Sequence, residues 1–192
     1  MGLDMYLNRM PRYRQATAKD VSNVGMYLKW IDYNAKREDK CTFKEWCGVS
    51  TKIPPKHMID FYKPHLIERY SHWDTEHEYG YMGIMEQVGY WRKVNAIHQW
   101  FVDCVQDGID DCDYHNEVTK EDLEELLDTC QRVLDDHSLA DELLPTQSGF
   151  FFGDTEYDEY YFADIEDTVD IIKNVLETTD FDKEMIYYVS SW

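Results

Sequence analysis

Apolar residues in the second half of the chain recur at the spacing of helices that bury one face. Between residues 119 and 135 they fall three and four positions apart, at Leu123, Leu126, Leu127, Cys130, Val133 and Leu134. Thr119 and Asp122 supply the start signal of this helix. Similar stripes run over residues 86–107, closed by Gly108, and from Asp154 or Thr155 to Leu176. The pattern therefore predicts three long helices.

Shorter apolar runs predict the strands. Residues 3–7, which are apolar except for Asp4, and the apolar residues 185–189 are each expected to form a strand. Residues 150–152 are three phenylalanines between Gly149 and Gly153, a pattern that indicates a buried strand or a tight turn.

The first half has weaker helical signals. We expect one helix to start at Asp20, and the pair Thr42 and Glu45 predicts a short helix that ends at Gly48. Residues 57–80 contain many aromatic residues, Pro64, His57, His65, His72 and His77. This composition favours strand and loop over helix in that stretch.

Together these elements predict an α+β fold in which helices dominate and a small sheet forms from the chain ends and residues 149–153. A chain of 192 residues with 43% apolar content can bury one sizeable core and is short for two. We therefore expect a single domain over residues 1–192, with a near-neutral part at residues 1–80 and an acidic helical part at residues 81–192.

Charge is distributed unequally between these parts. Residues 1–80 hold 13 Lys or Arg against 11 Asp or Glu, whereas residues 81–192 hold 6 against 28. Such a field repels nucleic acid and anionic membranes and attracts basic surfaces. We therefore expect a basic protein surface as the partner, with no direct contact to nucleic acid or membrane.

Other features favour a location in a reducing cytoplasm. The chain has no apolar run long enough to span a bilayer, and residues 1–10 lack the pattern of a secretion signal. Its five cysteines include no CxxC pair, so neither a disulfide framework nor a zinc ribbon is indicated. The sequence also lacks HExxH and similar boxes, and we expect no metal and no cofactor.

Two polar clusters are candidates for a ligand pocket. In the first, Trp91, Asn95 and His98 would share one side of the predicted helix over residues 86–107, with Arg92 beside Asn95. Such groups can stack on and hydrogen-bond a planar anion such as a nucleotide. The alternative is a core stripe in which His98 bonds to the backbone and Arg92 to a carboxylate.

The second cluster is a polar turn ahead of the third predicted helix, made by Thr146, Gln147 and Ser148. Backbone N–H groups at a helix start can bind an anion. The carboxylates of Asp154, Glu156 and Asp158 would repel one, however, and the turn matches neither a phosphate loop nor GxSxG. A turn and capping role is the alternative.

The carboxylates themselves are a third candidate. Glu121, Glu124, Glu125 and Asp128 are expected on the solvent side of the helix that follows Thr119. Acidic helices can compete for basic grooves that otherwise bind nucleic acid. The alternative is that these charges serve only solubility.

Several segments resemble a family of small uncharacterised proteins of bacteria and their phages. The matching segments are GLDMYL at Gly2–Leu7, VGYWRKVNAIHQWFV at Val88–Val102, LLPTQSGFFFG at Leu143–Gly153, YDEYYF at Tyr157–Phe162 and SSW at Ser190–Trp192. The resemblance implies a bacterial or phage origin. It also makes a shared pocket more credible, because both polar clusters fall within the matching segments.

These observations lead to one main functional hypothesis and two alternatives. The first is a non-catalytic, acidic, phage-type binding protein that engages a basic surface of a host nucleic-acid-handling or defence protein, as an inhibitor. The second is a protein that binds or hydrolyses a nucleotide-like small molecule in a pocket lined by Trp91, Arg92, Asn95, His98, Thr146, Gln147, Ser148, Asp158 and Trp192. The third is a structural subunit. We also expect Trp192 to be docked and its indole buried.

Overall fold

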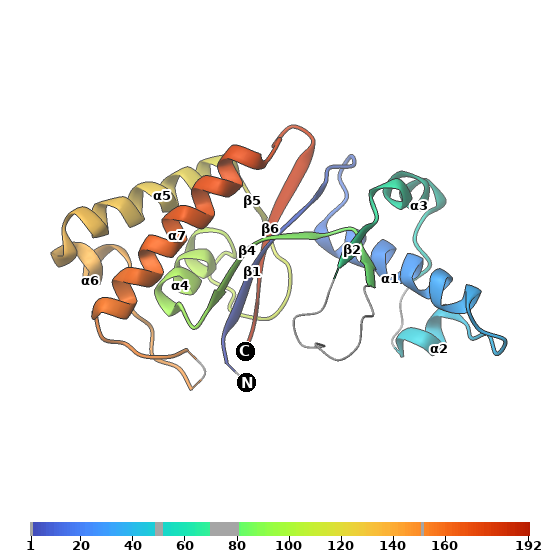
Figure 1. The fold of residues 1–192 in the computed structure, drawn as a ribbon, viewed down its shortest axis with the longest axis horizontal. Helices are drawn as coiled ribbons and strands as arrows, with labels where there is room; N and C mark the ends of the chain where they lie inside the picture. Colours follow the sequence, from blue (N-terminus) through green and yellow to red (C-terminus); the bar gives the residue numbers. More distant parts are fainter. Residues whose placement is uncertain (1, 49–51, 70–80, 151) are drawn as a thin grey trace. The chain divides into compact units, whose positions relative to one another are not determined.

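The computed structural model describes residues 2–48, 52–69, 81–150 and 152–192 (Figure 1). It confirms a helix-dominated α+β fold. The chain divides into two compact units: unit 1 contains Met1–Arg9 and Gln87–Trp192, and unit 2 contains Met10–Glu86. This boundary lies close to residue 80, where the charge changes. Whether the units fold as one domain stays a prediction.

The sheet of unit 1 has the order β4-β1-β6-β5. Both chain ends contribute to it, as predicted, through β1 (Asp4–Pro11) and β6 (Glu184–Ser191). The prediction that residues 149–153 join the sheet is wrong, because Phe150 and Phe152 lie in a turn. The other strands are β4 (Glu86–Arg92) and β5 (Glu117–Val118), and β5 pairs antiparallel with β6.

The predicted helix over residues 86–107 is instead the strand β4 followed by the shorter helix α4 (Asn95–Cys104). Gly89 lies where β4 comes close to its neighbours, because a Cβ at this position would lie 3.0 Å from Ile171 and 3.3 Å from Leu7. Contacts this short would require the neighbouring side chains to shift by a few tenths of an ångström, so glycine suits this position of the strand. Lys93, with a φ of 62°, then separates β4 from α4.

Two long helices, α5 (Lys120–Asp135) and α7 (Glu159–Thr178), pack against each other in unit 1 (Figure 1). The capping box of Thr119 and Asp122 is confirmed. Helix α7 begins later than the predicted Asp154 or Thr155, because the Asp158 carboxylate accepts hydrogen bonds from the N–H groups of Tyr160 and Tyr161. Along the chain, η2 (His137–Leu139) and α6 (Ala140–Leu143) connect the two long helices.

The core of unit 1 joins the sheet to α4, α5 and α7. The ring of Phe101 stacks on that of Tyr188 at 4.2 Å between centroids. Leu126 of α5 and Ile172 of α7 are fully buried in the same core. Burial of each such side chain contributes about 1.5–3 kcal/mol.

Unit 2 contains one long helix, α1 (Ala18–Ala35), and several short elements: α2 (Phe43–Cys47), α3 (Lys56–Tyr62), η1 (Lys63–His65), β2 (Ile67–Arg69) and β3 (Tyr81–Gly83). The capping box of Thr42 and Glu45, with Gly48 at the end of α2, is confirmed. Helix α1 begins two residues before Asp20, because Asp20 closes a capping box with Thr17.

The expectation of strand and loop after residue 57 is wrong for α3 and η1 and right for β2. Pro55 stands at the N-cap of α3, where the fixed φ of proline is compatible with helix entry. His72 and His77 lie outside the described residues. In the described parts of both units, no helix is long and apolar enough to cross a bilayer.

Candidate functional site

Asn95 brings the two predicted polar clusters together. Its Oδ1 accepts a hydrogen bond from the N–H of Gln147 at 2.8 Å. Its Nδ2 donates to the carbonyl oxygens of Phe152 at 3.0 Å and Asp154 at 2.8 Å. The side chain is 4% exposed, so these bonds form in a site with little competing water. Asn95 thus fastens the loop over residues 146–154 to the start of α4.

Trp91 and Arg92 do not join this arrangement. The indole of Trp91 is 3% exposed and donates its N–H to Thr168 Oγ1 at 2.9 Å, inside the core. Arg92, the next residue, is exposed. Successive side chains of a strand point to opposite faces, so Arg92 faces solvent while Trp91 faces the core.

His98 is the centre of a buried polar network. Its ring is 0% exposed, and Tyr188 Oη lies 2.7 Å from Nδ1 while Asp110 Oδ1 lies 3.1 Å from Nε2. A carboxylate only accepts hydrogen bonds, so a neutral imidazole donates Nε2–H to Asp110 and accepts the Tyr188 hydroxyl proton at Nδ1. Burial lowers the pKa of His98, against the opposing effect of Asp110, and raises the pKa of Tyr188 well above its usual value.

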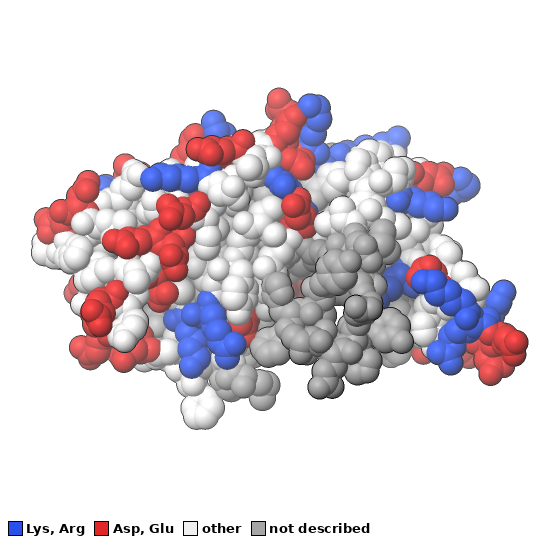
Figure 2. Space-filling view, viewed as in Figure 1, with Lys and Arg blue, Asp and Glu red and all other residues white. Residues whose placement is uncertain are grey.

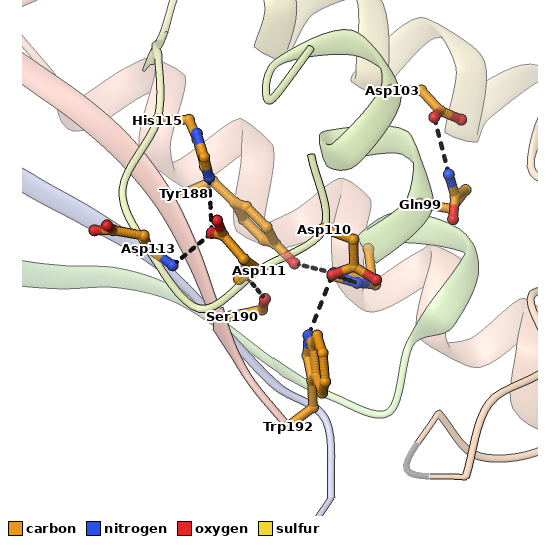
Figure 3. Close-up of polar contacts among 10 residues, drawn as sticks. Gln99, Asp103, Asp110, Asp111, Asp113, His115, Tyr188, Ser190 and Trp192 are labelled. Atoms are coloured by element: carbon orange, nitrogen blue, oxygen red, sulfur yellow. Dashed lines mark hydrogen bonds and ion pairs between the residues drawn. The ribbon is translucent and has the colours of Figure 1, made fainter. Parts of the chain in front are cut away.

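Trp192 completes this network at the surface. Its Nε1–H donates to the same Oδ1 of Asp110 at 3.2 Å (Figure 3). The prediction of a docked Trp192 is therefore right for its N–H, but the side chain is 41% exposed and the expected burial is wrong. The chain end turns the indole edge, not its full surface, towards the protein.

A second set of hydrogen bonds ties the loop between α4 and β5, which contains Asp110, to β6. Ser190, which is 2% exposed, donates its hydroxyl to the carbonyl oxygen of Asp111 at 3.3 Å. The Asp111 carboxylate accepts from His115 Nε2 at 2.7 Å and from the N–H of Asp113 at 2.8 Å (Figure 3). The aspartates at 110, 111 and 113 therefore hold the loop between α4 and β5 in place.

The sequence did not single out Asp110, Asp111 or Tyr188 as members of one site. In this network His98 and Tyr188 are separated by 90 positions in the chain, and Asp110 and Trp192 by 82. The spacing of residues within one segment cannot predict such contacts. The Tyr188 side chain is 1% exposed, so its hydroxyl is out of reach of a solute. The network is best explained as a clamp on the chain end.

The polar turn has mainly structural contacts. Thr146 Oγ1 donates to the carbonyl oxygen of Thr155 at 2.9 Å, and the Thr146 N–H donates to Tyr157 Oη at 3.3 Å. Ser148 is exposed, and Asp158 caps α7. Of the nine predicted pocket residues, the structure thus joins Asn95 to Gln147, and His98 to Trp192 through Asp110.

The four predicted acidic residues lie together on α5. Glu121, Glu124, Glu125 and Asp128 are all exposed, while Leu123, Leu126, Cys130 and Val133 of the same helix are buried. We call these four residues the α5 acidic face. One of them, Glu124, pairs with Lys120 at 3.1 Å.

Carboxylates dominate the surface of unit 1 beyond α5. The unit holds 28 Asp or Glu against 7 Lys or Arg, whereas unit 2 holds 11 against 12. Figure 2 shows acidic side chains gathered over the helical end of unit 1. On α7, burial and then the charges of Asp167 and Asp158 raise the pKa of Asp164 to about 6. Burial is the larger cause, and the two neighbouring carboxylates add to it, so ionisation of this carboxyl group is unfavourable in the folded protein.

Comparison with known protein families, with characterised proteins and with solved structures finds no match. The resemblance to bacterial and phage proteins stays a prediction. Among the described residues, no three His, Cys, Asp or Glu side chains gather as metal ligands do.

Proposed function

We propose that this protein is a non-catalytic binding protein whose acidic unit 1 engages a basic surface of another protein. The observation that carries the proposal is the excess of 28 carboxylates over 7 basic residues in that unit, with the α5 acidic face exposed to solvent. Fields of this size steer oppositely charged proteins into encounter and raise association rates.

The resemblance supports a narrower form of the proposal. In a phage setting, the partner would be a host protein that handles nucleic acid or takes part in defence, since such proteins carry basic grooves for the phosphate backbone. Carboxylates on a rigid helix can occupy such a groove in place of nucleic acid. The protein would then act as an inhibitor.

The alternative of a nucleotide-like ligand has less support. The polar groups of Trp91 and Asn95 are bonded to other groups of the protein, as are both ring nitrogens of His98. A ligand would have to displace these bonds and leave buried groups unpaired, which costs about 1–3 kcal/mol for each group.

The test compares three forms of the full chain. The first is the wild type, and the second neutralises the α5 acidic face by Glu121→Gln, Glu124→Gln, Glu125→Gln and Asp128→Asn. The third removes four charges from exposed positions of unit 2 by Asp32→Asn, Glu38→Gln, Asp39→Asn and Asp60→Asn. The two variants have equal net charge, so any difference between them comes from where the charges lie.

Each form is immobilised and exposed to a bacterial lysate at low and at high salt, and the bound proteins are identified by mass spectrometry. We expect the wild type and the unit 2 variant to retain the same basic proteins at low salt. The α5 variant should associate with them more slowly and show a weaker salt dependence. Equal association rates for all three forms across the salt range would contradict the proposal.

A further inference from the structure

Unit 2 has a surface on which aromatic rings and basic side chains occur together. Its near balance of 12 basic against 11 acidic residues conceals an uneven layout. Residues 10–20 and 52–66 hold 6 Lys or Arg against 2 Asp or Glu, whereas residues 67–86 hold 1 against 5. We call the surface over residues 10–20 and 52–66 the basic aromatic face.

The two segments of this face meet through a row of rings. Tyr13, from the first segment, stacks on Phe61 of α3 at 4.2 Å between centroids, with the ring planes 26° apart. The His57 ring lies 6.0 Å from Tyr13, and the His65 ring lies 5.2 Å from Phe61. The rings thus follow one another without interruption in the order His57, Tyr13, Phe61 and His65.

Backbone contacts hold this row in place. The buried Tyr62 donates its hydroxyl to the carbonyl oxygen of Pro11 at 3.1 Å, which joins α3 to the first segment. A turn follows, closed by the Ala16 N–H, which donates to the Tyr13 carbonyl oxygen at 3.0 Å. Arg14 lies in this turn with a φ of 54°, a conformation that is uncommon for residues other than glycine. Its guanidinium is 5.0 Å from the centre of the Tyr13 ring.

The row is accessible to a ligand, and cations accompany it. The terminal rings, His57 and His65, are exposed, while Tyr13 and Phe61 are half-buried. Asp60 is the one acidic residue of the second segment, and it pairs with Lys56. The exposed cations of the two segments include Arg14, Lys52, Lys56 and Lys63.

This combination fits a particular class of ligand. Each nucleotide of a single strand carries one negative phosphate and one planar base. Lys and Arg bind the phosphates, and the rings of Tyr, Phe and His stack on the bases. The bases of a duplex are enclosed in their own stack and cannot reach such rings. An acidic peptide would use the cations but has no planar group for each ring. A single strand therefore fits the face better than either alternative.

The acidity of unit 1 does not exclude such a ligand. The absence of nucleic-acid contact that the sequence predicts follows from the charge of residues 81–192, whereas the basic aromatic face belongs to unit 2. Exposed charges are screened over about 8–10 Å at physiological salt, so the charges nearest to a surface decide what binds there.

We propose that the basic aromatic face of unit 2 binds a single strand of nucleic acid. Its bases stack on the row of rings, and its phosphates contact the Lys and Arg side chains. This inference is independent of the proposed function, which concerns unit 1. Phosphates and bases are common to DNA and RNA, so the test includes both.

The first experiment measures binding to the full chain by fluorescence anisotropy. The probes are a labelled single strand of about 12 nucleotides, as DNA and as RNA, and the DNA duplex of the same sequence. We expect a single strand to bind at least about 10-fold more tightly than the duplex. The logarithm of its binding constant should fall with the logarithm of salt concentration with a slope of roughly −2 to −3, as for three or four phosphate contacts. Binding of neither strand, or equal binding of the duplex, would overturn the proposal.

The second experiment tests the rings. His57→Ser combined with His65→Ser removes both exposed rings of the row and should weaken binding of the single strand roughly 10-fold. His57→Tyr combined with His65→Tyr keeps a ring at each position without the imidazole and should retain the wild-type affinity. Because both positions are exposed, the melting temperatures should stay unchanged, which excludes misfolding. Equal affinity of the serine variant and the wild type would show that the rings do not contact the strand.

The third experiment tests the position of the charges. Lys52→Gln, Lys56→Gln and Lys63→Gln together should weaken binding and flatten its salt dependence. The control variant has the same net charge and changes three exposed lysines between the end of α1 and α2, by Lys36→Gln, Lys40→Gln and Lys44→Gln. We expect the control to bind as the wild type does. An equal loss in both variants would mean that only the overall charge acts, and the face would then not be a site.

Two further outcomes separate this inference from its alternatives. Oligoglutamate of the same charge should not displace the strand at equal concentration, and displacement would assign the face to an acidic peptide instead. The variant with a neutralised α5 acidic face should bind the strand no more weakly than the wild type, because it carries less negative charge. Weaker binding by that variant would place the strand on unit 1 and overturn the proposal. Conversely, a failure of the strand to bind leaves the association of unit 1 with a basic protein unaffected.

Discussion

Unit 1 and unit 2 are both compact, but they differ in the balance of acidic and basic residues. Unit 2 nearly balances its 12 basic against 11 acidic residues, and pairs such as Lys36 with Asp32 and Lys56 with Asp60 lie one turn apart on its helices. Unit 1 carries 28 acidic against 7 basic residues. Unit 2 shows that a unit of this chain can fold with balanced charge, so the excess in unit 1 calls for an explanation outside folding.

The largest expected effect tests whether the two units are independent. Leu126→Ala in unit 1 removes a fully buried side chain and should lower the free energy of unfolding by about 2–5 kcal/mol. Because the unit boundary falls within strands β1 and β4, we expect protection from hydrogen exchange to fall in both units. Denaturation monitored by circular dichroism and exchange monitored by mass spectrometry measure the two effects.

The matched variant is Leu28→Ala in unit 2, where Leu28 is 6% exposed. A single domain, as the sequence predicts, requires each variant to weaken protection in both units. If each variant affected only its own unit, the chain would consist of two independent domains.

The next effect concerns the buried network of unit 1. His98→Leu leaves the hydroxyl of Tyr188 without its acceptor in the core, and we expect a loss of about 1–3 kcal/mol in the free energy of unfolding. Adding Tyr188→Phe should recover part of the loss, because both polar partners are then gone. The control is His115→Gln, at a more exposed ring, and an equal loss there would contradict the prediction.

His98 also predicts a dependence on pH. Its pKa is lowered in the folded protein from the usual 6.5, so the unfolded chain binds more protons between the two pKa values. The stability contributed by the neutral ring is present above pH 6.5 and falls as the pH is lowered towards the folded pKa. Denaturation curves of the wild type and His98→Leu at several pH values should differ in slope within this window.

The smallest expected effect compares one carboxylate from each unit. Asp164 has a folded pKa of about 6 against an ordinary 3.8, so its ionised form is unfavourable in the folded state. Asp164→Asn should therefore stabilise the protein above pH 6, by about 1 kcal/mol once solvent screening is allowed for, or about 2–4 °C in melting temperature. This gain should fade as the pH falls from 6 to 3.8, because the wild-type carboxyl group then becomes protonated in both states.

In unit 2, Asp32→Asn removes the partner of Lys36 and should change stability by no more than about 0.5 kcal/mol, with no gain. Thermal melts at pH 7 and pH 4 distinguish the two variants. If both stabilised the protein equally, the charge of unit 1 would have no special cost.

Local signals in the sequence were reliable where one segment determines its own structure. Helix α5 was predicted with its cap at Thr119 and its buried face, because the cap and the apolar stripe lie within one segment. The strand β4 was not predicted, because the spacing of the apolar residues around Trp91 is compatible with the repeat of a helix and with that of a strand. The neighbours of Gly89, Ile171 and Leu7, come from distant parts of the chain, and no local pattern predicts their close approach.

The candidate site was also predictable only in part, namely for residues that a local pattern singles out. Asn95 and the turn at Gln147 were each singled out, and their contact is observed, but the network of His98, Asp110 and Tyr188 depends on contacts that no spacing encodes. The exposure of Phe150 was also unpredictable, since three consecutive phenylalanines indicate burial. The hydrogen bonds of Asn95 to the carbonyl oxygens of Phe152 and Asp154 join residues more than 50 positions apart, so a local pattern does not report them.

The position of β6 between β1 and β5 affects the protein as it is made. Strand β1 ends at Pro11 and β6 begins at Glu184, so β1 leaves the ribosome long before this neighbour exists. At about 5–20 residues per second, the delay is roughly 10–35 s. Residues 10–86 are synthesised during that time, while β1 still lacks its neighbour β6. A chaperone that shields nascent strands would therefore matter more for unit 1 than for unit 2.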